Sequence, residues 1–317
     1  MQGMITVFQK ELADHFTSWR FIILFALVFL AGVFTIYVDS QNIRGEVAGP
    51  AQFIFLRLYT TSDETLPGFL QLLYLFAVFF VPIIGIALGF DAINEEKNNG
   101  TMGRLLSQPI FRDAVINGKF LAGVATIAIM LVSILLLVAG VGISMIGVPP
   151  SSEEVIRLMA FLVSSIIYGA FWLGLAILFS VFFRRVATSA LASIAVWLFF
   201  FFFMSMLVEV LANVVAPVGE TVASQVRNIE FQITATRFSP ILLFQESMTV
   251  LMVPGARTLG QILQLQTGAG AWMIATPLSL GQSLLMVWPH LVSMIALTAV
   301  CFGISYTKFM REEIRST

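Results

Sequence analysis

Long apolar runs alternate with charged segments along this chain, and the alternation predicts its fold. The apolar runs lie at about residues 21–38, 68–90, 120–146, 158–183, 187–215 and 284–306. About 20 apolar residues are enough for a helix to cross the hydrocarbon core of a bilayer, and each run is close to that length or longer. We therefore predict an all-α, polytopic membrane protein, with residues 21–317 forming one transmembrane domain of six helices.

The first 20 residues are too polar to cross a bilayer, but they have the pattern of an amphipathic helix. Apolar side chains recur at spacings of three and four, which places them on one helical face. They are Met4, Ile5, Phe8, Leu12, Phe16 and Trp19. Lys10, Glu11 and Asp14 fall on the other side, so we predict a helix in the plane of the membrane interface. A plain membrane-proximal start to the first span is the alternative.

Two of the apolar runs also carry information about helix packing. Pro82 lies in the middle of the second run, where it predicts a kink. Gly85 and Gly89 are spaced to let another helix approach closely. The run Phe199–Phe203 leaves no polar face in the fifth span, so we expect its rings to contact lipid or packed helices.

Composition agrees with a membrane protein and excludes other classes. Hydrophobic residues make up 58% of the 317 residues and charged residues 11%, whereas soluble domains carry about 25% charged residues. The net charge of −1 gives no bulk attraction to nucleic acid, so no nucleic-acid partner is expected. The one cysteine, Cys301, excludes an internal disulfide and is best explained as a small buried apolar residue.

Basic residues predict the orientation of the spans. With the N-terminus inside the cell, eleven Lys and Arg residues fall on cytoplasmic segments and six on outer segments, which are longer in total. The side richer in basic residues usually faces the cytoplasm. We therefore predict a multi-pass protein of the plasma membrane, with the lipid bilayer around it and both termini in the cytoplasm.

Residues 91–119 form a charged segment between two spans. They hold four of the seventeen basic residues, Lys97, Arg104, Arg112 and Lys119. A Gly100-Thr101 break precedes a piece long enough for a short helix, and Ser107 with Pro109 is typical of an N-cap and a first-turn proline. A loop that only joined two spans could be much shorter. We predict that another protein contacts this loop; an ordinary solvated loop is the alternative.

The same segment resembles the first cytoplasmic loop of type-2 ABC transporter permeases. The residues that carry the resemblance are Glu95-Glu96, Gly100-Thr101, Leu105-Leu106, Ser107, Pro109, Arg112 and Lys119. The Lys10-Glu11 pair is similar to the start of that family's elbow helix. The run from Ser180 through Arg184-Arg185 to Thr188 resembles its tight inner turn.

The resemblance implies a function and a set of partners. In that family the first cytoplasmic loop holds a coupling helix that docks into a separate ATP-binding subunit, and two permease subunits pair about a central axis. ATP and Mg²⁺ would then belong to the partner ATPase, and this chain would hold no catalytic residue, cofactor or metal. The coupling residues so implied are Glu95, Glu96, Gly100, Thr101, Arg104, Leu105, Leu106, Pro109 and Arg112. The sequence agrees, because it contains no Walker phosphate loop.

Residues 216–280 are too many for an unstructured loop in a compact protein. We predict short helices packed over the outer mouth of the spans, one of them beginning with Ser239 as N-cap and Pro240 in its first turn. In the resembled family the last outer connection is also helical and often shorter. The enlarged segment could hold specificity for a substrate or an extracytoplasmic partner; a lid without specificity is equally compatible.

Few residues in the spans could carry chemistry. Glu209, late in the fifth span, and His290, early in the sixth, are ionisable groups in regions where charge is costly. Glu209 is the candidate contact for a substrate pathway, and a side chain that reaches the outer membrane surface is the alternative. The run Glu153–Arg157 approaches an intramembrane protease motif but is one residue short. The two histidines and the scattered methionines do not form a metal-binding pattern.

Two functional hypotheses from different classes follow. The first is the permease subunit of an ATP-binding cassette exporter, driven by a separate ATPase through residues 91–119. The second is a membrane scaffold or assembly factor without transport activity, which recruits one cytoplasmic and one extracytoplasmic protein. A neighbouring reading frame that encodes a Walker-motif ATPase would favour the first.

Overall fold

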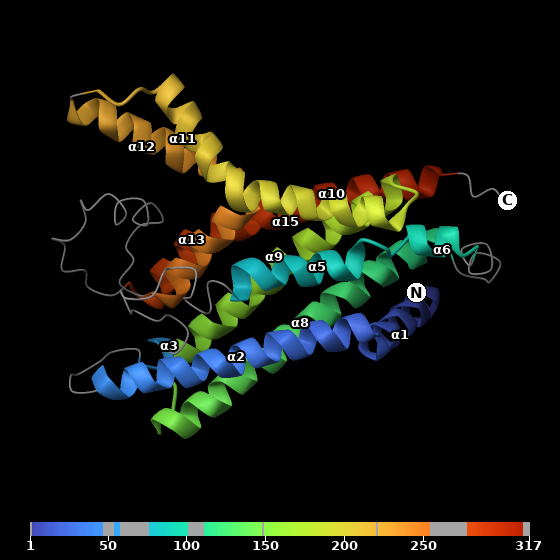
Figure 1. The fold of residues 1–317 in the computed structure, drawn as a ribbon, viewed down its shortest axis with the longest axis horizontal. Helices are drawn as coiled ribbons and strands as arrows, with labels where there is room; N and C mark the ends of the chain where they lie inside the picture. Colours follow the sequence, from blue (N-terminus) through green and yellow to red (C-terminus); the bar gives the residue numbers. More distant parts are fainter. Residues whose placement is uncertain are drawn as a thin grey trace.

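The computed structural model of the protein is a helical bundle. It describes residues 2–46, 54–57, 76–100, 111–147, 149–219, 221–253 and 278–312. Every regular element within those ranges is a helix (Figure 1). The predicted all-α class is therefore confirmed.

The chain begins with two helices that meet at a sharp bend. Helix α1 (Gln2–Thr17) and helix α2 (Trp19–Glu46) are related by a bend of 62°. Ser18 forms the corner: its hydroxyl donates to the backbone carbonyl of His15 and accepts from the backbone N–H of Phe21. The side chain therefore closes the end of α1 and the start of α2, which gives the predicted elbow shape.

The next described elements are short. Helix α3 (Ile54–Arg57) is followed by a π-helical turn, η2 (Phe76–Phe80), and then by α5 (Val81–Gly89) and α6 (Asn94–Asn98). Pro82 lies in the first turn of α5, and its missing N–H leaves the carbonyl of Val78, four residues earlier, to accept from the Tyr168 hydroxyl at 3.4 Å. The expected kink in mid-helix is therefore replaced by the π-helical turn that precedes the proline.

Helix α5 packs closely against α9 (Ser152–Phe182) through its two glycines. A Cβ atom on Gly85 would lie 2.8 Å from the backbone oxygen of Gly169, and one on Gly89 would lie 2.8 Å from the Cβ of Ala176. The predicted close approach is confirmed, and the partner is a helix of the same chain.

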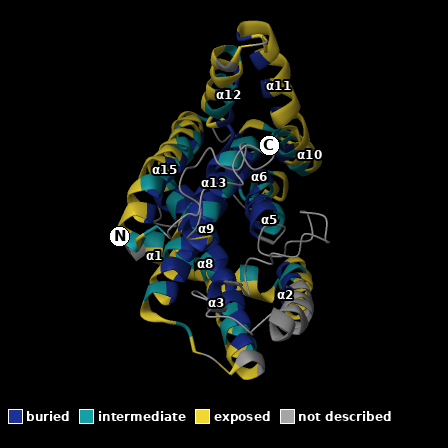
Figure 2. Ribbon diagram, turned by 90° about the vertical axis from the view of Figure 1, so that its left-hand side faces the viewer, coloured by how far each residue is buried: buried dark blue, intermediate teal, exposed yellow. Residues whose placement is uncertain are grey.

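Helix α9 is the centre of the bundle. It buries 78% of its most apolar 18-residue window, whereas the segment Val186–Val215 and helix α15 (Leu280–Arg311) bury 17% each. Figure 2 shows this difference, with buried positions along α9 and exposed ones on α10, α11 and α15. Helix α8 (Arg112–Ile146) buries 33% of its most apolar window, an intermediate value.

The fifth span and the segment after it form an extension from the bundle. Helix α10 (Val186–Leu198) continues through a second π-helical turn, η3 (Phe199–Phe203), into α11 (Met204–Val215). Helix α12 (Val222–Thr236) packs back on α11, and the pair projects away from the other helices (Figure 1). Helix α13 (Pro240–Met252) returns to the bundle and packs on α9 and α15. As predicted, Ser239 caps α13 and Pro240 opens it.

Five described helical segments are long and apolar enough to cross a membrane, when short elements that follow one another in one helical run are counted as one segment. The bent pair α1–α2 brings the number of candidate spans to six. The start of α1 and the end of α15 lie at the same end of the bundle as α6 (Figure 1). We call this the α6 end, and the opposite end, where α3 and the start of α9 lie, the α3 end.

The run Glu153–Arg157 fixes the α3 end rather than forming a protease site. The buried Glu154 accepts hydrogen bonds from the backbone N–H groups of Phe55 and Leu56 in α3. The guanidinium of Arg157, which is 0% exposed, donates to Glu153, to Ser283 of α15 and to the backbone carbonyls of Leu251 and Leu278. These two side chains join α3, α9, α13 and α15.

Candidate coupling site

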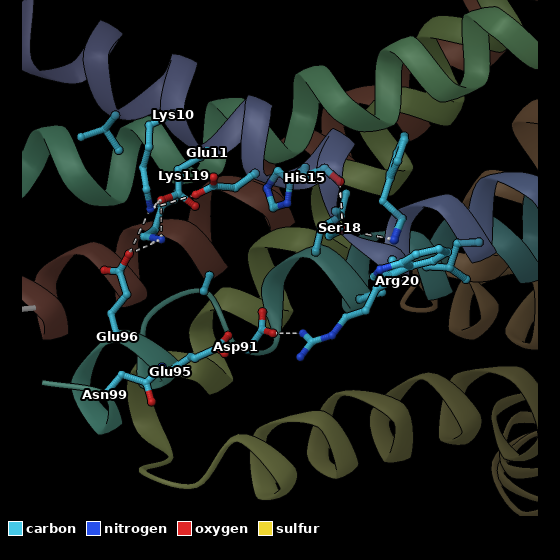
Figure 3. Close-up of a pocket in the computed structure, with 18 of the residues that line it drawn as sticks. Lys10, Glu11, His15, Ser18, Arg20, Asp91, Glu95, Glu96, Asn99 and Lys119 are labelled. Carbon is cyan, nitrogen blue, oxygen red and sulfur yellow. Dashed lines mark hydrogen bonds and ion pairs between the residues drawn. The ribbon is translucent and has the colours of Figure 1, made fainter. Parts of the chain in front are cut away.

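A buried lysine joins three helices at the α6 end. Lys119, two turns into α8, is 6% exposed, and its ammonium group lies 2.9 Å from a carboxylate oxygen of Glu11 and 2.9 Å from one of Glu96. Glu11 belongs to α1 and Glu96 to α6, so the three side chains converge from three elements (Figure 3). A buried ammonium group needs charged partners, and the two carboxylates supply them.

Lys10 extends this cluster to the surface of α1. Its ammonium group lies 2.9 Å from Glu11, 3.1 Å from Asp14 and 4.0 Å from Glu96. Burial by itself would raise the pKa of Glu11, but the ammonium groups of Lys119 and Lys10 outweigh burial and hold that pKa below its ordinary value. Glu11 is therefore ionised at neutral pH, and charge holds α1 to α8 and α6.

A second set of contacts ties the end of α15 to both sides of residues 101–110. The carboxylate of Glu312, directly after α15, accepts a hydrogen bond from Lys97 Nζ of α6 at 2.5 Å. Its backbone carbonyl accepts one from Arg112 Nη1, at the start of α8, at 2.8 Å. Lys97 precedes residues 101–110 and Arg112 follows them, so one residue contacts both flanks of this segment.

Helix α6 is also held to the turn between α9 and α10. Ser180 Oγ accepts hydrogen bonds from the backbone N–H groups of Ile93 and Asn94 at 2.9 and 3.1 Å, which satisfies two donors at the start of α6. The side chain of Asn98 donates to the backbone carbonyl of Arg184 at 3.0 Å. The turn that resembles the family's inner turn therefore supports α6.

A cavity of about 870 Å³ lies beside the Lys119 cluster, among residues of α1, α2, α5, α6 and α8 (Figure 3). At its edge an ion pair between Arg20 of α2 and Asp91 joins the first span to the segment between α5 and α6. The Arg20 guanidinium also lies 5.5 Å from the centre of the Phe90 ring.

Four of the predicted coupling residues fall in the described part of the chain. Glu96 and Arg112 take part in the contacts above, Glu95 lines the cavity, and Gly100 follows α6 with a φ of 68°. The other predicted coupling residues, Thr101, Arg104, Leu105, Leu106 and Pro109, lie outside the described residues.

The two ionisable residues predicted inside the spans have different surroundings. Glu209 is exposed on α11. His290 is buried, and its Nε2 lies 2.8 Å from a carboxylate oxygen of Glu246 in α13. Glu246 was missed because α13 falls in the predicted outer segment, although its apolar run Ile241–Phe244 was a signal for burial. Among the residues that the structure describes, no three His, Cys, Asp or Glu side chains form a potential metal site.

Comparison with known proteins gives the family. The profile of the ABC-2 family transporter proteins matches residues 5–314. The chain belongs to the ABC-2 transporter family. A protein of Pseudomonas aeruginosa named "Probable ABC transporter permease protein NosY" is 28% identical to it over 217 residues, which cover 68% of this chain and 72% of the relative. The predicted resemblance is confirmed: the chain is a transmembrane permease subunit of an ABC transporter, and its family implies an ATPase partner.

In this ABC-2 permease, residues 101–110 are flanked by the contacts of the α6 end. Glu96 and Lys97, just before the segment, pair with residues of α1, α8 and the end of α15. Arg112, just after it, bonds to the same Glu312. The segment is therefore attached to a rigid base made from helices that are distant in the sequence.

Proposed function

We propose that this chain is the permease subunit of an ABC exporter, driven by a separate ATPase that binds residues 91–119. The observation that supports this proposal most strongly is the attachment of both flanks of residues 101–110. Three salt bridges and the Arg112–Glu312 hydrogen bond link those flanks to α1, α8 and the end of α15. A force applied to the segment would reach the elbow helix α1 and the third and sixth spans together.

The proposed mechanism divides the work between two chains. ATP and Mg²⁺ bind to the ATPase, whose closure displaces the segment that holds Leu105 and Leu106. The displacement passes through α6 to α5, which is packed on the central helix α9 through Gly85 and Gly89. Glu95 and Arg104 set the register of the contact by polar interactions, while Glu96 and Arg112 hold the flanks through Lys119 and Glu312.

We further propose that two copies of the permease pair in the plasma membrane, with both termini in the cytoplasm. The segment Val186–Val215 and helix α15 bury only 17% of their most apolar windows in a single chain, which leaves apolar faces for lipid and a second copy. The basic residues Lys97, Arg112 and Lys119 lie at the α6 end, as a cytoplasmic assignment of that end requires.

The direct test is a pair of charged substitutions in the segment. Leu105→Asp/Leu106→Asp should abolish co-purification of the ATPase, because apolar anchors would be replaced by carboxylates. Val155→Asp/Ile156→Asp is a matched control, since these adjacent apolar residues are exposed at the start of α9, at the opposite end of the bundle. The control should retain the ATPase. An ATPase that stays bound to the Leu105/Leu106 variant would show that the coupling assignment is wrong.

The alternative is a scaffold that binds an ATPase and an outer partner without moving a substrate. The projecting α11–α12 pair favours an outer contact, because its apolar residues Leu211, Val214 and Val226 are exposed. ATPase turnover distinguishes the two functions: an exporter should hydrolyse ATP faster when reconstituted with its substrate, and a scaffold should not respond.

A further inference from the structure

We infer that the cavity at the α6 end binds the headgroup of an aminophospholipid from the adjacent membrane leaflet. This inference does not depend on ATPase coupling. It depends on the charges that line the cavity, on its apolar wall and on its position at the elbow.

The cavity carries more negative than positive groups. Its lining contains five carboxylates and three fixed cations, so a bound cation would be favoured. The cations are already engaged: Lys119 and Lys10 contact Glu11 and Glu96, and Arg20 contacts Asp91. The excess negative charge is therefore available for a cation from outside the chain.

The excess of negative charge is greatest at Asp91 and Glu95, which lie one helical turn apart. The charge of Glu95 acts on Asp91, and Arg20 is the one cation paired with Asp91 in the described contacts. Asn99, one turn further on, lines the same cavity and adds an amide oxygen. A primary ammonium group has three N–H donors and could bond to all three side chains. A quaternary ammonium group has no N–H donor, so the site should prefer ethanolamine to choline.

The rest of the cavity fits a lipid better than a soluble amine. Phe21 and Leu24 of α2 and Leu88 of α5 line its other wall and offer an apolar surface to an acyl chain. Trp19, which is 78% exposed, stands at the elbow, as aromatic residues do at the headgroup level of a membrane. The guanidinium of Arg20 uses Nη1 for Asp91 and has further N–H donors for a phosphate (Figure 3).

Binding of short-chain lipids to the delipidated full-length protein tests this inference. Dihexanoyl phosphatidylethanolamine should bind about tenfold more tightly than dihexanoyl phosphatidylcholine, as expected from a charge-assisted hydrogen bond. Glu95→Gln should lower the affinity for the ethanolamine lipid to that for the choline lipid. Glu95→Lys should abolish the preference as well, because its own ammonium group would occupy the site. Glu230→Gln, an exposed control on α12, should leave the preference unchanged.

Two results would overturn the inference. Equal affinity for the two lipids in the wild-type protein would show that no ammonium site exists. Glycerophosphoethanolamine tests the source of the headgroup: it lacks acyl chains and should bind at least tenfold more weakly than the lipid. If it bound as tightly, the ligand would be a soluble amine and not a membrane lipid. Unchanged thermal unfolding of the two Glu95 variants would show that their effects on binding are not caused by misfolding.

Discussion

Lys119 is the buried residue that joins α1, α6 and α8 at the α6 end. Its side chain is 6% exposed and lies between carboxylates from two other helices. In a site so poorly solvated, an ion pair need not stabilise the fold more than well-packed apolar residues would. The ion pair does determine which helices pack together, because Glu11 and Glu96 would each be buried without their main counter-charge if Lys119 were absent.

Replacing Lys119 with Met should destabilise the protein by about 3–5 kcal/mol, because Glu11 and Glu96 would then face each other without the buried cation. Unfolding in detergent, followed by denaturant titration, measures this change. Lys10→Met is the matched control: Lys10 contacts the same carboxylates but its side chain is 52% exposed, so the loss should be below about 1 kcal/mol.

The triple variant Glu11→Gln/Lys119→Met/Glu96→Gln should recover much of the lost stability, because no buried charge is left alone. If Lys119→Met unfolds at the same denaturant concentration as the wild type, the cluster does not hold these helices together.

Among the helices, the contact between α5 and α9 is the one that tolerates the least change. The glycines of α5 face backbone atoms of α9, and backbone cannot move aside as a side chain can. The sequence predicted a close approach from the spacing of Gly85 and Gly89, but it did not predict α9 as the partner. Spacing shows which face is small, whereas the choice of neighbour depends on how all helices pack.

Gly85→Ala should destabilise the protein by about 1–3 kcal/mol, because the new Cβ would lie 2.8 Å from the backbone oxygen of Gly169 and 3.0 Å from the backbone nitrogen of Leu173. Gly140→Ala in α8 is the control: no atom lies within 4 Å of its added Cβ, and alanine favours a helix. The control should unfold at the wild-type temperature or above it. Equal melting temperatures for both variants would contradict the close packing of α5 on α9.

Some elements could be predicted in detail and others could not. The cap of α13 by Ser239 was predicted because capping is local and depends on adjacent residues. The π-helical turn before Pro82 was not, because a single proline is compatible with several local geometries. Arg157 was considered only as part of an incomplete protease motif, but its fully buried side chain holds the helices of the α3 end together.

Across the whole molecule, the end of α15 packs beside residues that lie far from it in the sequence. Glu312 lies 215 residues from Lys97 and 200 residues from Arg112, yet it bonds to both. Apolar runs predicted the class of the fold, because crossing a membrane requires length and low charge. These long-range pairs were not predictable, because each depends on which helices become neighbours.

Glu312→Gln should loosen the Lys97 flank of residues 101–110 with little effect on total stability, because Arg112 bonds to the backbone carbonyl that glutamine keeps. The Lys97–Glu312 pair is partly exposed, with side chains that are 22% and 34% exposed, so its loss should change the free energy of unfolding by less than about 1 kcal/mol. Hydrogen exchange should nevertheless rise at α6 while the backbone N–H groups of Phe55 and Leu56, bonded to Glu154, stay unchanged. Unchanged exchange at α6 would mean that Glu312 does not restrain it.

The five phenylalanines of η3 set the direction in which the α11–α12 pair leaves the bundle. A π-helical turn contains an extra residue, so α11 starts about 100° out of angular phase with α10. Trp197 before the turn is buried against Phe79 of η2, whereas α11 after it is packed on α12. If the same five residues formed an ordinary α-helical turn, α12 would be rotated by about a quarter of a turn around that axis. The wide turn is thus an angular spacer: the residue that it absorbs, more than the ring chemistry of the five phenylalanines, decides the direction in which α12 projects.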